Sequence, residues 1–273
     1  MSNLVMKKRG KGRPPGIKKE VAPVAIFDPK SIHIIKGSEL KFDDSVFRPM
    51  RTGTLMDDIL SSSKGLMPAV NMIICGGPGT GKSTVVLDML ARLTKTGKKC
   101  LFVSGEMDEI GHFKYCKRMP HFATVPTLFL KNYTETLKET LEYVFAQGYD
   151  VVAIDSIAEV IEMYKDTYRT TESAAELWFL SLQEKIKKGE NKAKKYTSFI
   201  NIQQVTKAGD FAGSNRLKHM TEAMCHLERI KNSDSRKVYF SKNRDNSIDF
   251  HITYRIGLNQ VEYSLAEAGE DDE

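Results

Sequence analysis

Short apolar runs alternate with amphipathic segments along the chain from about residue 52 to beyond residue 200. We expect buried strands in the runs NMIICGG, KCLFVSGE, DVVAID and YTSFINIQQ, because each is short and largely apolar. We expect helices in KSTVVLDMLARLTKTG, TLKETLEYVFAQG and AAELWFLSLQEKIKKG, each of which ends at a glycine. Strands that alternate with helices of this length predict an α/β fold, with a mainly parallel sheet covered by helices on both faces.

The pattern changes beyond residue 222. We expect short strands in AMCHLERI, RKVYFSKNR and FHITYRI, linked by the turns NSDS and RDNS, and these predict an antiparallel extension at the sheet edge. The sequence shows no internal repeat and no second globular domain. We therefore divide the chain into a basic tail (1–22), a linker or interface segment (23–50), one α/β core (51–263) and an acidic tail (264–273).

Composition narrows the class of protein. The chain has 273 residues, a formal net charge of +6 and the composition of a globular protein. No apolar run approaches a membrane span and no leader segment opens the chain, so we expect a soluble, cytoplasmic protein with no membrane partner. The four cysteines lack CxxC spacing and form no ligand pattern with the histidines, so we expect reduced thiols and no zinc site.

Basic residues are concentrated near the N-terminus. Residues 7–19 hold seven cations and no acid, which predicts a tail without a core of its own. Within it, Gly12–Pro14 reads GRP and resembles the AT-hook, in which an arginine enters the minor groove of A·T-rich DNA. Arg13 is therefore a candidate DNA contact, and a solubilising extension is the alternative.

A phosphate-binding motif lies directly between a predicted strand and a predicted helix. The stretch GGPGTGKST fits the pattern GxxxxGK[ST] and comprises Gly76, Gly77, Pro78, Gly79, Thr80, Gly81, Lys82, Ser83 and Thr84. Its glycines let backbone amides surround phosphate oxygens, and Lys82 is expected to reach the β and γ phosphates. We therefore predict that this loop binds ATP, with the Ser83 hydroxyl on Mg²⁺.

Two carboxylates follow the next apolar strands. Asp155 ends DVVAID, beside the phosphate loop in a parallel sheet, and is a second candidate ligand of Mg²⁺, with helix capping as the alternative. Glu106 ends CLFVSGE, where it can orient and deprotonate a water near the γ phosphate. From the residues alone, Glu106 fits a general base and a helix cap equally well.

Six stretches in this order resemble the RecA-type ATPases, and most closely the RadA (Sms) DNA-repair family, with the DnaB ring helicases more distant. They are RTG at Arg51–Gly53, GGPGTGKST, LFVSGE, VVAIDSI, VTKAGDFAGSNRLKHM and SKNRDN, and they span most of residues 51–263. The resemblance implies a RecA-like core in which Glu106 is the catalytic base and Gln204 senses the γ phosphate. It also implies that Lys242 and Arg244 reach the nucleotide of a neighbouring subunit in a homo-oligomer. The alternative for this pair is protective charge on an edge strand.

The sequence departs from the RadA pattern in several places. The RadA sequence KNRFG is KNRDN in this chain. Gln204 stands where RadA has histidine, and in this respect the chain is more similar to DnaB and RecA. We expect neither the RadA zinc module nor its Lon-like domain here, which leaves open the steps that depend on them. A core with a basic tail is a composition typical of phages and mobile elements.

The segment VTKAGDFAGSNRLKHM, residues 205–220, is polar and glycine-rich. In RecA-type proteins this place holds a loop that faces DNA, so Lys207, Arg216 and Lys218 are candidate phosphate contacts. A solvated connection is the alternative. The segment EMYKDTYRTTESAAE occupies the place of the second such loop, with Lys165 and Arg169 as candidates.

We therefore expect a DNA-dependent ATPase that acts on single-stranded or branched DNA in recombination, repair or replication, as a hexameric ring with helicase or translocase activity. Replication or recombination proteins are its expected partners. The alternatives are a filament-forming strand-exchange recombinase, a signalling ATPase that resembles KaiC, and a nucleotide-gated DNA-binding module. Trp178 is expected in the core, whereas Tyr115 and Arg118 either flank the adenine or lie on a helix surface.

Overall fold

The computed structural model describes residue 32 and residues 34–205 and 213–265. Arg13, Lys207 and the basic tail lie outside these residues, as does most of the acidic tail. The chain divides into two units, residues 1–42 and 43–273. The described part of the first unit holds one short 3₁₀ turn, Gly37–Glu39. The second unit carries the fold.

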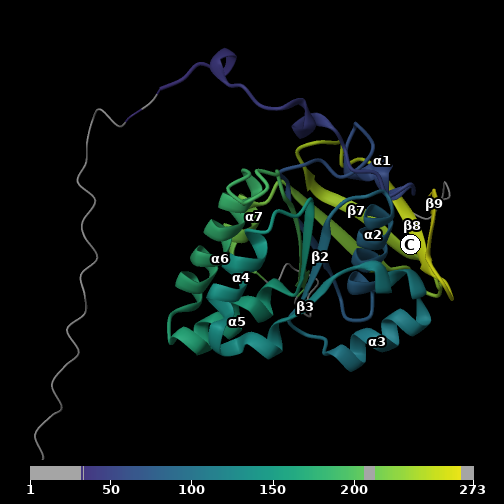
Figure 1. The fold of residues 1–273 in the computed structure, drawn as a ribbon. Helices are drawn as coiled ribbons and strands as arrows, with labels where there is room; N and C mark the ends of the chain where they lie inside the picture. The colour runs from purple at the N-terminus through teal and green to yellow at the C-terminus, as the bar shows by residue number, and fades with distance from the viewer. Residues whose placement is uncertain (1–31, 33, 206–212, 266–273) are drawn as a thin grey trace, which may run out of the picture. The chain divides into compact units, whose positions relative to one another are not determined.

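The described strands form one nine-stranded sheet in the order β3-β2-β4-β5-β1-β6-β7-β8-β9 (Figure 1). The strands are β1 (Asn71–Gly76), β2 (Cys100–Ser104), β3 (Thr127–Phe129), β4 (Val151–Asp155), β5 (Ser198–Gln204), β6 (Ala223–Arg229), β7 (Arg236–Asn243), β8 (His251–Ile256) and β9 (Val261–Leu265). The first six strands in that order are parallel, and β7, β8 and β9 are antiparallel. The predicted mainly parallel sheet with an antiparallel extension is confirmed.

Helices cover both faces of the parallel part, also as predicted (Figure 1). The α-helices are α1 (Met56–Leu60), α2 (Lys82–Lys95), α3 (Glu109–Arg118), α4 (Leu137–Phe145), α5 (Ile157–Tyr168), α6 (Glu172–Lys187) and α7 (Asn215–Met220). The 3₁₀ helices of this unit are η3 (Asp44–Phe47), η4 (Pro120–Thr124) and η5 (Leu130–Thr136). No helix within the described ranges is long and apolar enough to cross a membrane.

Strand alternation divides the core into two layers. In β1, Met72 and Ile74 pack with α2, whereas Ile73 and Cys75 pack with α4, α5 and α6. This follows from the period of two along a strand, because both faces of a parallel sheet are buried. The strands β7, β8 and β9 contribute side chains such as Tyr254 to the α2 layer only. The extension therefore shares the core that supports the phosphate loop.

Three local expectations differ from the structure. The strand predicted in AMCHLERI is β6, and it runs parallel to β1, so the antiparallel part begins only at β7. Strand direction is set by hydrogen-bonding partners, which the local pattern does not show. The segment EMYKDTYRTTESAAE is not a loop but the end of α5 and the start of α6, because Thr171 caps α6 by accepting from the Ala174 amide. The last residues of VTKAGDFAGSNRLKHM form α7, capped by Ser214.

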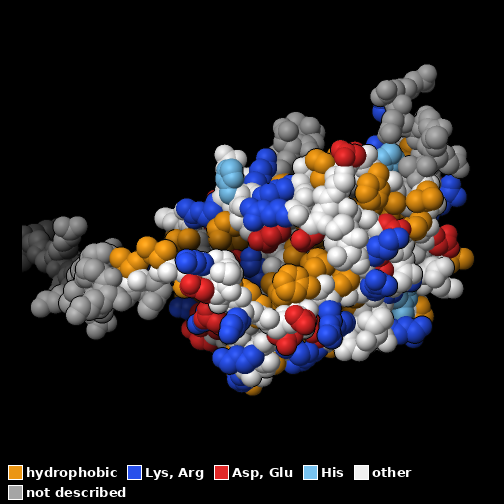
Figure 2. Space-filling view, turned by 90° about the horizontal axis from the view of Figure 1, so that it is seen from above, with side chains coloured by type: hydrophobic (Ala, Val, Ile, Leu, Met, Phe, Trp, Pro, Cys, Tyr) orange, Lys and Arg blue, Asp and Glu red, His pale blue; other side chains and the backbone are white. Residues whose placement is uncertain are grey.

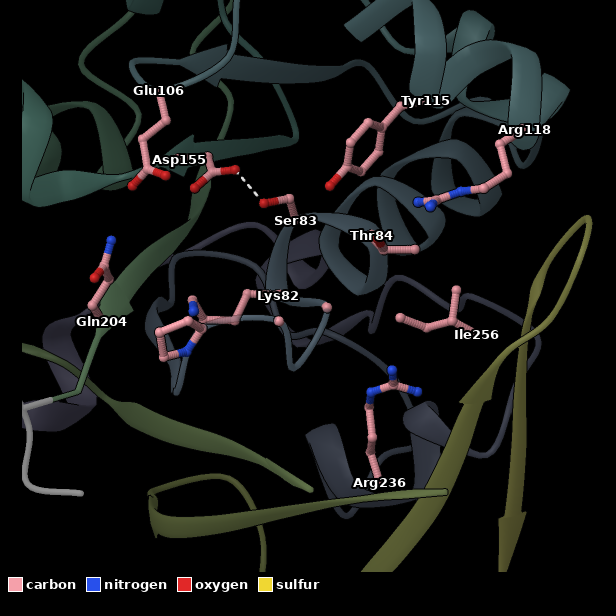
Figure 3. A pocket seen from close by; sticks show the side chains of 13 residues that line it. Lys82, Ser83, Thr84, Glu106, Tyr115, Arg118, Asp155, Gln204, Arg236 and Ile256 are labelled. Carbon is pink, nitrogen blue, oxygen red and sulfur yellow. Dashed lines mark hydrogen bonds between the residues drawn. The ribbon is translucent and has the colours of Figure 1, made fainter. Parts of the chain in front are cut away.

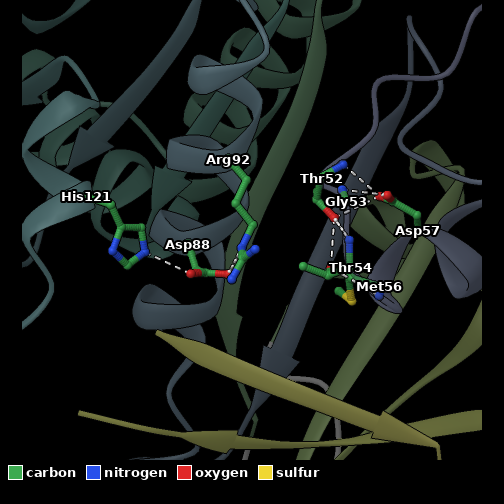
Figure 4. Close-up of polar contacts among 8 residues, drawn as sticks. All are labelled: Thr52, Gly53, Thr54, Met56, Asp57, Asp88, Arg92 and His121. Carbon is green, nitrogen blue, oxygen red and sulfur yellow. Dashed lines mark hydrogen bonds and ion pairs between the residues drawn. The ribbon is translucent and has the colours of Figure 1, made fainter. Parts of the chain in front are cut away.

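A buried carboxylate organises the RTG segment (Figure 4). Asp57 accepts hydrogen bonds from the amide and hydroxyl of Thr52 at 2.9 and 2.8 Å, and from the Gly53 amide at 2.8 Å. The amide nitrogens of Asn243 and Asn246 donate to main-chain carbonyls of α1. Asn243 and Asn246 of the KNRDN sequence therefore connect α1 to the extension by hydrogen bonds.

A second buried carboxylate lies on α2 (Figure 4). Asp88 pairs with Arg92 one turn later at 2.7 Å and with His121 Nε2 at 2.9 Å. Because His121 belongs to η4, this carboxylate ties α2 to the segment that follows α3. These ion pairs offset the free-energy cost of burying the Asp88 carboxylate.

Candidate nucleotide-binding site

A pocket of about 540 Å³ opens at the carboxyl edge of the parallel strands (Figure 3). Residues from the phosphate loop, from three strand ends, from α3 and from the extension line it: Pro78, Gly79, Gly81, Lys82, Ser83, Thr84, Glu106, Tyr115, Arg118, Asp155, Gln204, Arg236 and Ile256. Ligand sites in open α/β sheets form outside the carboxyl ends of the strands, which is where this pocket lies.

The phosphate loop depends on glycine at specific positions. Gly79 and Gly81 have φ angles of 72° and 95°, a region that side chains disfavour. A Cβ at Gly81 would also meet Ile256 Cδ1 at 2.4 Å. The Lys82 ammonium donates to the carbonyls of Gly76 and Gly77 at 2.8 and 3.1 Å. It therefore lies folded onto the loop that it is predicted to serve.

Asp155 and Ser83 meet beside this loop. The Ser83 hydroxyl donates to Asp155 Oδ2 at 2.5 Å. Burial raises the pKa of Asp155 to about 6, and the nearby Glu106 adds to the rise, while the Ser83 bond and the Lys82 charge oppose it. The half-buried Ser83 hydroxyl and the buried Asp155 carboxylate are the hard oxygen ligands that Mg²⁺ prefers, so this pair fits the predicted metal site.

Glu106 and Gln204 approach the pocket from the ends of β2 and β5 (Figure 3). The amides of Gly105 and Glu106 donate to the Asp155 carbonyl at 2.7 and 3.2 Å, so the two strand ends are bonded to each other. The Glu106 carboxylate remains exposed to solvent. The structure thus brings both side chains into one pocket with Lys82 and Asp155, and their catalytic roles stay predictions.

Lys242 and Arg244 lie far from the pocket, at the side of the sheet where the parallel strands begin. In the β6–β7 pair, Arg229 faces Arg236 at the pocket end and Ala223 faces Asn243 at the far end. Arg236 and Arg244 are eight residues apart, which spans about 27 Å of extended chain. The Lys242 ammonium donates to the Lys218 carbonyl at 2.8 Å. Neither cation reaches the pocket of its own chain.

The described DNA-binding candidates divide into two groups. Arg216, exposed on α7, donates to the Ser173 carbonyl at 3.2 Å, and Lys218 is half-buried on the same helix. Lys165 lies within α5 and pairs with Glu162 at 2.6 Å, and Arg169 occupies a left-handed turn between α5 and α6. In the second group, Lys165 therefore lies on a helix, and Arg169 lies in the tight turn between two helices rather than on a long loop.

The sequence pattern did not predict the contributions of the extension and of the end of β6. Arg236 and Ile256 line the pocket, although about 150 residues or more separate them from the phosphate loop. Arg229 donates to the Gly79 carbonyl at 3.0 Å, and the buried Tyr254 hydroxyl donates to the Thr80 carbonyl at 2.7 Å. No local pattern could identify such contacts, because they depend on how distant strands pair.

Two candidates for the adenine wall are brought together on α3. Tyr115 and Arg118 both line the pocket, and the guanidinium lies 4.9 Å from the centre of the tyrosine ring (Figure 3). The ring and the stacked cation offer a flat surface to an aromatic base. Contact with adenine remains a prediction.

Comparisons with known proteins identify proteins of similar sequence and of similar fold. No family model matches the chain. The RadA DNA-repair proteins of Campylobacter jejuni and Listeria monocytogenes are 32% and 31% identical to it, over 71% of this chain and 40% and 39% of theirs. RadA of Mycobacterium tuberculosis is 26% identical over 74% of this chain and 40% of its own. The expected resemblance to RadA is confirmed, and the chain spans about two-fifths of the length of these relatives.

Solved structures show the fold. A KaiC-like protein of Pyrococcus horikoshii superposes with a TM-score of 0.61 at 17% identity, covering 79% of this chain and 98% of that one. A RadB recombinase gives 0.57 at 19%, covering 78% and 98%. The flagellar accessory protein FlaH of Methanocaldococcus jannaschii gives 0.56 at 14%, covering 77% and 95%. The chain therefore has the RecA-like fold that its motifs predict.

The brace on the phosphate loop generates a stability prediction. We expect Tyr254→Phe to lower the free energy of unfolding by about 1–2 kcal/mol, because the Thr80 carbonyl loses its buried donor. Tyr263→Phe is the matched control, since its buried hydroxyl has no partner among the described residues. Urea unfolding of both variants measures the difference, and equal losses would contradict the brace.

Proposed function

We propose that this chain is a Mg²⁺-dependent ATPase that binds DNA and acts on single-stranded or branched DNA in recombination, repair or replication. The observation that supports it most is the convergence of Lys82, Asp155, Glu106 and Gln204 on one pocket at the carboxyl edge of a RecA-like sheet. Helicase or translocase activity and a ring-shaped homo-oligomer are the finer parts of the proposal.

Each group has a distinct task in hydrolysis. The loop amides and Lys82 hold the phosphates, and Ser83 and Asp155 would hold Mg²⁺, which supplies charge neutralisation when bound. Glu106 accepts the proton of the attacking water, for which its solvent-exposed carboxylate beside Asp155 is suited. Gln204 contacts the γ phosphate from the end of β5 and relays its presence to the segment that follows.

DNA binding draws support from the relatives and from chain order. The proteins with the sequence likeness are named for DNA repair. In this chain, the residues directly after Gln204 lead to α7, which presents Arg216 on its exposed surface. A DNA phosphate that engages this segment can bias the position of Gln204, and so couple DNA binding to hydrolysis.

The position of Lys242 and Arg244 supports a site shared between subunits. They lie at the sheet edge away from the pocket of their own chain, so they can complete only the site of another subunit. Two cations there would offset charge on the transferred phosphoryl group. Hydrolysis would then require assembly.

The nucleotide site is tested by separating binding from turnover. We expect Lys82→Ala to lose ATP binding and hydrolysis together, because the cation that holds the phosphates is gone. Glu106→Gln should keep binding but lose turnover by roughly two to four orders of magnitude, the usual contribution of a general base. Calorimetric binding and single-turnover hydrolysis measure the two effects. Normal hydrolysis by Glu106→Gln would exclude it as the base.

The shared site is tested by mixing inactive variants. Arg244→Ala removes the cation that a subunit contributes to the site of its neighbour. Glu106→Gln removes the base in the subunit's own site. Mixed assemblies should therefore contain some intact sites and recover part of the ATPase activity. The control is each variant alone at the same total concentration. An absence of recovery in a mixture shown to co-assemble would argue against a cation acting in trans.

DNA contact is tested through the salt dependence of binding. Lys207→Ala with Arg216→Ala should flatten the slope of log affinity against log salt by roughly 0.7 per lost phosphate contact on single strands. It should also reduce stimulation of the ATPase by DNA while DNA-free hydrolysis stays near its original level. Lys95→Ala with Lys185→Ala removes two exposed cations elsewhere and serves as the control. An unchanged slope and full stimulation would leave the segment as a polar connection.

A further inference from the structure

A cation from the extension enters the nucleotide pocket. Arg236 is the first residue of β7, and its guanidinium points into the pocket from the side opposite Tyr115 and Arg118 (Figure 3). Asn243, at the other end of the same strand, lies at the opposite sheet edge. Arg236 is therefore the only residue of β7 among those that line the pocket in the described structure.

The guanidinium is held in place but incompletely bonded. Its Nη1 donates to the Asp234 carbonyl at 3.2 Å, and its carbon lies 6.0 Å from the centre of the Tyr254 ring. Its Nε is buried and has no hydrogen-bond partner among the described residues. A buried donor of a charged group is rarely left unpaired, so an acceptor that is not part of this chain would complete its bonding.

The charge of the pocket identifies the chemistry of that acceptor. The pocket is lined by three cations, Lys82, Arg118 and Arg236, and by two carboxylates, Glu106 and Asp155, which gives a formal charge of 3 − 2 = +1. Without Arg236 the sum is zero. A polyphosphate, which carries several negative charges, gains from the additional cation. Guanidinium groups bind phosphate oxygens with strong, charge-assisted hydrogen bonds.

We propose that Arg236 binds a phosphate group of the nucleotide held by its own subunit. The inference rests on the proposed nucleotide site and adds a cation that the phosphate-loop motif does not contain. Ile256 lies over Gly81 and the Tyr254 ring lies beside the guanidinium, so the extension provides both the cation and its support. A phosphate contact made from β7 couples the extension to the occupancy of the site.

The experiment compares Arg236→Met with Lys237→Met by calorimetric binding of Mg²⁺-ATP and of inorganic tripolyphosphate. Each variant loses one cation from β7, but Lys237 does not line the pocket and lies over the Tyr239 ring. We expect Arg236→Met to bind both ligands roughly ten- to a hundredfold more weakly, the usual effect of losing a hydrogen bond to a charged group. Arg236→Lys should retain part of the affinity, and Lys237→Met should stay within about twofold of the original protein.

Two outcomes would overturn the assignment. Equal affinities of Arg236→Met and Lys237→Met would mean that Arg236 only packs against Tyr254. A loss for ATP without a loss for tripolyphosphate would mean that Arg236 contacts the nucleoside and not a phosphate. If the unaltered protein bound neither ligand, the proposed nucleotide site would fail with it. Binding that depends on Lys82 but not on Arg236 would overturn this inference alone.

Discussion

The hydrogen bond between Ser83 and Asp155 joins the two halves of the candidate site. It links the first turn of α2 to the end of β4, and β5 lies between β4 and β1 in the sheet. The bond is possible because parallel strands end at one edge, and the same constraint brings Glu106 and Gln204 there. Burial makes the Asp155 charge unfavourable, as its raised pKa shows. A divalent cation held by this pair would offset that cost, which would make metal binding and local stability interdependent.

The antiparallel extension supports the phosphate loop and lines part of the pocket at the ends of the parallel strands. Tyr254 of β8 donates to a carbonyl of the phosphate loop, as does Arg229 at the end of the neighbouring β6, and Ile256 packs on Gly81. The strand β7 starts at the pocket of its own chain and ends at the opposite sheet edge, near Lys242 and Arg244. If both ends bind phosphates, one rigid strand connects two nucleotide sites in an assembly. This is a physical route by which one site could influence the next.

The fold class and the placement of the central residues could be predicted from sequence because they rest on local patterns. Apolar runs specify strands, and the spacing GxxxxGK[ST] places Lys82 and Ser83 at the start of a helix. The contributions of Arg236 and Ile256 could not be predicted, since they depend on pairing between strands far apart in sequence. The direction of β6 is set in the same way by its hydrogen bonds to β1. The helices on either side of Arg169 were not predicted, because the polar turn that joins them resembles a loop in the sequence.

We propose that ATP is bound and turned over between subunits that assemble with DNA. A cryo-electron microscopy map of the protein with Mg²⁺, a slowly hydrolysed ATP analogue and single-stranded DNA tests it most directly. We expect nucleotide density along the loop of residues 76–84, in contact with Lys242 and Arg244 of an adjoining subunit. We also expect DNA beside the segment that follows Gln204. Nucleotide bound by single, unassembled chains, with DNA elsewhere or absent, would overturn this proposal.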